Sequence, residues 1–266
     1  MIRTMSLTLC TALTVLPAAA EQLPPGVVSA RLLPGWTDGD GNRVSALELR
    51  LEPGWKTYWR NPGDSGLPPS FDWRESENLA EVAFHWPAPE AIRSGGELTL
   101  GYHDLLVLPF TAKPADPGRP VELAAGIDLG VCEKICVPAH FDLQAPAAGE
   151  RPDPVIETAL SRMPEPLPAT PACTRREIED GIQLSVLLPR QEVDVAAMEL
   201  DGHPDIWVST ATLEAEGQDI RATADFVPPS GEPFDLDVDN LRITLIGTDG
   251  AVEMRGCDLQ TAAFGG

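Results

Sequence analysis

Four of the five cysteines are the residues whose type and spacing could do chemistry beyond packing. Cys132 and Cys136 are separated by three residues, whereas Cys173 and Cys257 stand far apart in the C-terminal part of the chain. An even number of cysteines in an exported protein indicates two disulfides, and four cysteines allow three connectivities. The spacing favours Cys132 with Cys136 and Cys173 with Cys257, because a three-residue gap can reach the short Cα separation that a disulfide requires.

Loop length predicts different roles for the two pairs. In the chain-entropy model a loop of about 85 residues gains roughly 4.5 kcal/mol from closure and one of about five residues roughly 2 kcal/mol. The Cys173–Cys257 pair is therefore predicted to be a structural staple. The short pair gains little from closure, and a disulfide in a tight, exposed turn is typical of labile, redox-active sites. Lys134 could activate a neighbouring thiol, although Glu133 opposes it, so the residues alone leave a redox site and a structural clip both open.

Two other kinds of site were weighed. Cys132, Cys136 and His140 form a C-x3-C-x3-H run that could hold Cu(I) or zinc, but no fourth protein ligand is evident. Residues 63–66 (GDSG) look like the nucleophile segment of trypsin-like proteases, yet the first histidine, His85, follows the serine instead of preceding it. The flanking prolines indicate a rigid turn there. Neither hydrolysis nor a metal site is the favoured interpretation, and no organic cofactor is expected.

The N-terminus predicts export. Arg3 is the only charge in the first twenty residues, an apolar run follows it, and three alanines precede Glu21. This pattern predicts a cleaved signal peptide over residues 1–20, which would also remove Cys10. Without Arg3 the mature chain carries 18 basic and 41 acidic residues, a net charge of −23. Such a charge disfavours nucleic acids and anionic membrane surfaces as partners, and we expect a periplasmic protein without membrane insertion.

Alternating apolar and polar residues between proline- and glycine-rich turns predict an all-β protein. The candidate strands are residues 44–51, 98–110, 121–129, 182–188, 206–209, 220–226 and 241–246. Residues 149–169 are rich in proline and contain one plausible helix, 154–163. We therefore predict a first β-sandwich over 21–148, a linker over 149–169 and a second, smaller sandwich-like domain over 170–266, with a single domain and a long crossover as the alternative. Most tryptophans are expected in the core of the first domain.

Two segments resemble a known family. Residues 54–66 (GWKTYWRNPGDSG) and 131–138 (VCEKICVP) look like the N-terminal periplasmic region of DsbD-type thiol:disulfide interchange proteins, with the likeness closest to the ScsB-like branch associated with copper tolerance. The resemblance covers most of the predicted first domain and is weaker over the second. It implies an immunoglobulin-like sandwich whose redox pair is Cys132 and Cys136, with Cys136 favoured as the attacking thiol. The chain ends without the membrane and thioredoxin-like domains of the family's reductases.

The resemblance also implies partners and a shield. The partners would be a membrane-embedded electron donor and thioredoxin-like periplasmic proteins. A loop would cover the cysteines until a partner docks, and residues 97–104, with Glu97, Tyr102, His103 and Asp104, fall where that loop is expected. Two hypotheses of different classes follow. The first is a thiol-disulfide oxidoreductase component, and the second is a non-catalytic periplasmic module that binds a protein or copper and has purely structural disulfides.

Overall fold

The structure is a computed structural model, and it describes residues 23–64, 66–94, 96–189, 193–248 and 250–260. The expected signal peptide, residues 1–20, and Cys10 lie outside the described residues. Strands dominate the described chain, which has one short α-helix, α1 (Pro154–Leu160), and one 3-10 turn, η1 (Val238–Asn240). The predicted all-β fold class is confirmed.

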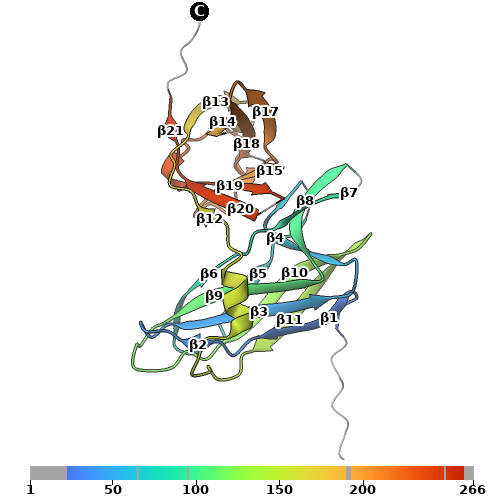
Figure 1. Ribbon diagram of the computed structural model, residues 1–266, viewed down its shortest axis with the longest axis vertical. Helices are drawn as coiled ribbons and strands as arrows, with labels where there is room; N and C mark the ends of the chain where they lie inside the picture. Colours follow the sequence, from blue (N-terminus) through green and yellow to red (C-terminus); the bar gives the residue numbers. More distant parts are fainter. Residues whose placement is uncertain (1–22, 65, 95, 190–192, 249, 261–266) are drawn as a thin grey trace, which may run out of the picture.

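Two facing antiparallel sheets are built from residues 27–144, here called the first unit (Figure 1). One has the order β1-β3-β9-β6 with β2 on β3, and the other the order β11-β10-β4-β8-β7 with β5 on β10. The strands are β1 (Val27–Leu32), β2 (Trp36–Thr37), β3 (Arg43–Leu51), β4 (Lys56–Gly63), β5 (Ser70–Asp72), β6 (Leu79–Phe84), β7 (Glu90–Ser94), β8 (Glu97–His103), β9 (Leu105–Pro114), β10 (Ala124–Cys132) and β11 (Cys136–Gln144).

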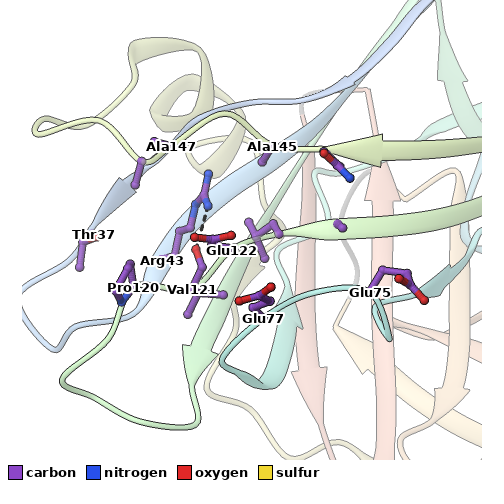
Figure 2. A pocket seen from close by; sticks show the side chains of 13 residues that line it. Thr37, Arg43, Glu75, Glu77, Pro120, Val121, Glu122, Ala145 and Ala147 are labelled. Carbon is purple, nitrogen blue, oxygen red and sulfur yellow. Dashed lines mark hydrogen bonds between the residues drawn. The ribbon is translucent and has the colours of Figure 1, made fainter.

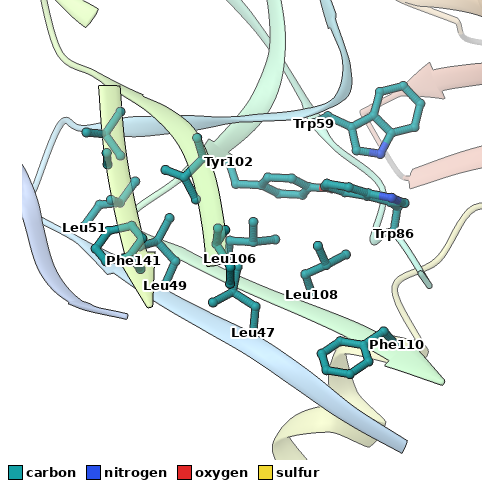
Figure 3. Packing of buried hydrophobic residues seen from close by; sticks show 14 of the residues in the cluster. Leu47, Leu49, Leu51, Trp59, Trp86, Tyr102, Leu106, Leu108, Phe110 and Phe141 are labelled. Atoms are coloured by element: carbon teal, nitrogen blue, oxygen red, sulfur yellow. The ribbon is translucent and has the colours of Figure 1, made fainter. Parts of the chain in front are cut away.

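The core of the first unit lies between these sheets, as Figure 3 shows. Alternate residues of β3, among them Leu47 and Leu49, point into it, because successive side chains of a strand leave opposite faces. The other face of β3 is also covered, since Ala46 packs against Ile156 of α1. Trp59 is fully buried in the core, as expected for most of the tryptophans.

Arg43 holds the end of this sandwich together. Its buried guanidinium donates to the carbonyl oxygens of Val121 (2.9 Å), Pro34 (3.0 Å) and Pro146. Figure 2 shows it at the edge of a pocket whose other charged lining residues include Glu122. Burial lowers the pKa of Arg43 from its usual value. Because three backbone carbonyls already satisfy this cation, we assign it to the architecture of the loops.

A second pair of sheets is built from residues 165–259, here called the second unit. Their orders are β12-β20-β19-β15 and β16-β18-β14-β13-β21, with β17 on β18. The strands are β12 (Glu165–Pro166), β13 (Ala172–Ile178), β14 (Gly181–Pro189), β15 (Val195–Leu200), β16 (Trp207–Val208), β17 (Thr212–Glu216), β18 (Asp219–Val227), β19 (Leu241–Gly247), β20 (Gly250–Arg255) and β21 (Asp258–Leu259). A separate core fills the space between these sheets.

Several predicted boundaries need correction. Residues 98–110 are two strands, because the chain leaves one sheet after β8 and enters the other at β9. Asp104 makes that turn with a φ of 59°, which Asp tolerates better than most residues. The apolar pattern continues through the turn because both strands face the same core. The strand expected at 121–129 begins and ends three residues later, and α1 ends at Leu160, not at 163.

The two units touch directly. Val195, Ala197 and Ile246 of the second unit join the apolar cluster of the first. Part of the predicted linker also belongs to a sheet, since β12 pairs with β20. Whether the units are domains that fold independently at the predicted boundaries stays a prediction. None of the helices in the described part of the chain is long and apolar enough to span a lipid bilayer.

Candidate redox site

The candidate site is the end of a β-hairpin. Strands β10 and β11 pair along their whole length, and the last cross-strand pair is Cys132 opposite Cys136. These two cysteines form a disulfide with a Cα separation of 4.1 Å. The turn between the strands is residues 133–135, since Gly130 lies in β10 and Pro138 in β11.

The two sulfur-bearing residues differ in accessibility. Cys132 is only 2% exposed, whereas Cys136 lies on the surface. Ile135, which precedes Cys136, is 76% exposed, so an apolar side chain projects beside the accessible sulfur. Thiol-disulfide exchange requires access to the sulfur that is attacked or that attacks. This arrangement therefore offers Cys136 to a protein partner and keeps Cys132 behind it.

Tyr58 of β4 reaches both sulfurs. Its hydroxyl lies 2.9 Å from Cys132 Sγ and 3.0 Å from Cys136 Sγ. A disulfide sulfur carries no hydrogen, so the phenol is the donor in this state. Burial, and secondly the charge of Glu97, raise the pKa of Tyr58 above its usual value. The hydroxyl therefore stays protonated at neutral pH and remains able to donate.

A covering segment, defined as residues 61–64 and 66–69, lies over Tyr58. Gly66 lies so close to the Tyr58 ring that a Cβ there would overlap it, and a Cβ on Gly130 would lie 2.8 Å from the ring on another side. The same Cβ on Gly130 would lie 3.6 Å from Leu67 Cβ. Tyr58 is consequently only 3% exposed, although it belongs to an outer sheet face. The segment thus packs on Tyr58, the residue whose hydroxyl contacts both sulfurs.

The charges around the hairpin are modest. Lys134 lies 3.8 Å from Glu133 and is largely exposed, so solvent and its neighbour both screen it. Lys56 stands directly opposite Cys132 in the β4–β10 pairing, and its Nζ lies 3.5 Å from Thr99 Oγ1. The sequence interpretation considered Lys134 but not Lys56.

The predicted shielding loop at residues 97–104 is not a loop. Glu97 and Tyr102 belong to β8, which pairs with β4 on one side and β7 on the other. Tyr102 is buried and donates to Pro87 O at 2.8 Å, and His103 Nδ1 lies 2.8 Å from Glu90 Oε2. Such a strand cannot swing aside without breaking two ladders. Asp104 forms the turn after it, and the segment that lies over Tyr58 follows β4 instead.

The residues considered for a metal are not brought together. Both sulfurs are joined to each other, and His140 lies four residues along β11 from Cys136, roughly 13 Å away in an extended strand. His140 Nδ1 is 2.8 Å from Asp128 Oδ1, and this hydrogen bond raises the pKa of the imidazole. Over the described residues no group of three or more His, Cys, Asp or Glu could hold a metal ion.

The second disulfide joins Cys173 of β13 to Cys257, just before β21, with a Cα separation of 5.8 Å. Both cysteines are buried in the core of the second unit. The pairing predicted from the spacing is thus the pairing in the structure. The roles assigned to the two disulfides stay predictions.

The sequence interpretation did not single out Tyr58 as a functional residue. Alternation along β4 contains part of the signal, because successive side chains leave opposite faces of a strand and Tyr58 therefore points away from the face of Trp59. The missing information was which strand lies beside β4. The pairing of β4 with β10 joins residues more than seventy positions apart.

Comparison with known proteins agrees with this geometry. Residues 29–148 match the model of the family described as "Thiol:disulfide interchange protein DsbD, N-terminal". The structure resembles the crystal structure of the N-terminal periplasmic domain of ScsB from Proteus mirabilis, with a TM-score of 0.63, 23% identity and coverage of 87% of this chain and 92% of that chain. A chimeric titin Z1Z2 has a TM-score of 0.17 at 11% identity, which carries no structural argument. Among curated protein sequences nothing matched.

The residues that match the family of DsbD N-terminal domains, 29–148, contain both the cysteine hairpin and Tyr58. The resemblance predicted from the two motifs is confirmed. The two sequence motifs lie in the first unit. The likeness in fold to the ScsB domain covers most of the second unit as well.

Proposed function

We propose that the protein is a periplasmic thiol:disulfide interchange component that carries two electrons on Cys132 and Cys136. The observation that carries the proposal is the asymmetric, hydrogen-bonded disulfide at the hairpin end. One sulfur is exposed beside an apolar side chain, the other is buried, and one phenol contacts both. The family match over residues 29–148 supports the same chemistry.

The exchange proceeds in two steps. In the reduced protein, the Cys136 thiolate attacks a partner's disulfide, a bond forms between Cys136 Sγ and one partner sulfur, and the partner's other sulfur leaves as a thiolate. The Cys132 thiolate then attacks Cys136 Sγ, which closes the disulfide and releases the partner's second thiolate. Two electrons pass to the partner, and protons from the two cysteine thiols end on the partner's thiols. A dithiol protein of the donor side reduces the pair again by the reverse sequence.

Tyr58 has a role in both states. It donates to the sulfurs of the disulfide, and after reduction the same hydroxyl can donate to whichever sulfur is a thiolate. A hydrogen bond to a charged group is about twice as strong as a neutral one, so it favours the thiolate. The proposed partners are thioredoxin-like periplasmic proteins and a membrane-embedded donor, as in the family.

Mixed-disulfide trapping tests the proposal. In cells that export the protein, Cys132→Ala should accumulate disulfide-linked complexes through Cys136, because no resolving thiol remains. Cys136→Ala should accumulate few, since its remaining cysteine is buried. Non-reducing electrophoresis and mass spectrometry of the complexes give the readout and name the partners. If neither variant forms complexes, the non-catalytic binding module replaces the interchange hypothesis.

A further inference from the structure

The second unit binds β4 at Arg60, close to the redox site. This arginine follows Tyr58 by two positions on β4 and precedes the covering segment. Its guanidinium carbon lies 4.0 Å from the centroid of the Trp59 ring, which belongs to the first unit's core. Its Nε and one terminal nitrogen, however, bind side chains of the second unit.

The guanidinium of Arg60 is bound by side chains of one sheet of the second unit. Arg60 Nε lies 3.1 Å from both carboxylate oxygens of Glu199, and its NH2 lies 3.0 Å from Glu253 Oε2 and 3.3 Å from Thr244 Oγ1. These three partners stand on the adjacent strands β15, β20 and β19. The side chains of Arg60, Glu199 and Glu253 are 14%, 18% and 18% exposed. Charge-assisted hydrogen bonds at such low exposure are stronger than surface ion pairs.

The same connection continues into the covering segment. Asn61 Nδ2 donates to Met198 O at 3.3 Å, and Asn61 Oδ1 accepts from the Gly63 amide at 3.1 Å. Asp64 then binds β8 twice, through its amide to Leu98 O at 3.0 Å and through Oδ2 to the Leu98 amide at 2.8 Å. The covering segment is thus held at Asn61 by the second unit and at Asp64 by β8.

We infer that the second unit holds the covering segment over the redox disulfide, so that Glu199 is a positioning residue for exchange at Cys132 and Cys136. The inference rests on the proposed function. It differs from a purely architectural role of the interface, because it links a carboxylate on β15 to the reactivity of a disulfide on another sheet. Releasing Arg60 should loosen the covering segment and Tyr58 beneath it, and so uncover the buried Cys132 side of the disulfide, since Cys136 is accessible already.

The test is Glu199→Gln in the full-length mature protein, which keeps the shape of the side chain and removes its charge. The rate of reduction of the Cys132–Cys136 disulfide by dithiothreitol is followed by quenching with an alkylating reagent and peptide mass spectrometry. We expect about a tenfold faster reduction of this pair, which corresponds to the loss of about one charge-assisted hydrogen bond. The Cys173–Cys257 pair should reduce at an unchanged rate.

The control is Glu216→Gln, which breaks a more exposed carboxylate–arginine pair with Arg221 on β18 of the second unit. It should leave the reduction of both disulfides unchanged. A Glu199→Gln rate within twofold of the wild type overturns the inference. So does an equal acceleration by the control, because the effect would then be general loosening of the second unit.

A second variant covers the case in which Glu199→Gln does not fold. Thr244→Val removes one acceptor of Arg60 and leaves both carboxylates, and it should accelerate reduction of the short pair about threefold, in line with one neutral hydrogen bond. No acceleration in a folded Thr244→Val protein overturns the inference in that case. Failure of the proposed function has a different signature, since the Cys132→Ala variant would then trap no disulfide-linked complexes in cells.

Discussion

Replacing Tyr58 by Phe isolates the contribution of one hydroxyl. The ring would keep its packing against Gly66 and Gly130, while the contacts of 2.9 and 3.0 Å to the two sulfurs would be lost. In the oxidised protein a neutral hydrogen bond of this kind is worth about 1 kcal/mol. In the reduced protein the lost bond is to a thiolate, for which about 1.5–3 kcal/mol is typical. The variant should therefore affect reactivity more than stability.

The expected shift follows from these values. One pH unit corresponds to 1.36 kcal/mol, so the pH midpoint of thiolate formation should rise by about one to two units. Each unit lowers the thiolate fraction at neutral pH about tenfold, while the greater intrinsic nucleophilicity recovers roughly threefold. Exchange with a partner disulfide at pH 7 should thus slow by roughly three- to tenfold.

The assay is the pH dependence of iodoacetamide alkylation, after selective reduction of the short pair and with the long pair intact. Tyr102→Phe is the matched control, because Tyr102 is equally buried on the neighbouring strand and donates to Pro87 O, away from the sulfurs. A Tyr58→Phe midpoint within about 0.3 units of the wild type, well below the expected shift, would refute the role of this hydroxyl. An equal shift in the control would assign the effect to repacking.

Three further predictions concern stability and access. Dithiothreitol should reduce the short pair before the long one, and removal of Cys173 and Cys257 together should lower the unfolding free energy by about 2–5 kcal/mol in urea titrations. Burial lowers the pKa of His85, whose Nε2 is 2.7 Å from Thr111 Oγ1. The unfolded chain therefore binds more protons below pH 6.5, and stability should fall as the pH drops through that value, less steeply in His85→Gln. Gly130→Ala should place a Cβ 2.8 Å from the Tyr58 ring, lower stability by about 1–3 kcal/mol and speed alkylation of the reduced pair.

Each of these has a contrary result. Equal reduction rates for the two disulfides would remove the distinction between a labile pair and a staple. A His85→Gln protein with the wild-type pH dependence between pH 7.5 and 5 would place the titrating group elsewhere. A Gly130→Ala protein with unchanged stability and alkylation rate would mean that the Tyr58 ring does not need the space beside Gly130.

Local chemistry was readable from the sequence. Alternation with a period of two marks strands wherever one face is buried, and it marked β3, β14, β18 and β19 closely. The spacing of the cysteines was sufficient for their pairing, because the short pair can close within a hairpin and the remaining two then have only each other. The proposed redox role of Cys132 and Cys136 also came from the sequence, through two motifs that resemble a family whose model matches residues 29–148.

Periodicity failed where the physical cause was not local. It could not divide residues 98–110, because β8 and β9 present apolar residues to one core from two different sheets. The family resemblance placed the shield at residues 97–104, because sequence position does not show that β8 is hydrogen-bonded along both edges. Strand alternation gives the face of a residue but not the strand beside it.

The sequence by itself determined the strand-rich fold class and the two cysteine pairs, and it is the basis for the expected export. Only the tertiary structure decided what surrounds the reactive pair. Tyr58 reaches the sulfurs because β4 lies beside β10, and Arg60 reaches Glu199 because a sheet of the second unit packs against the same strand. Both contacts join residues far apart in the chain, and such contacts depend on how sheets pair and pack, which no local pattern of residue types specifies.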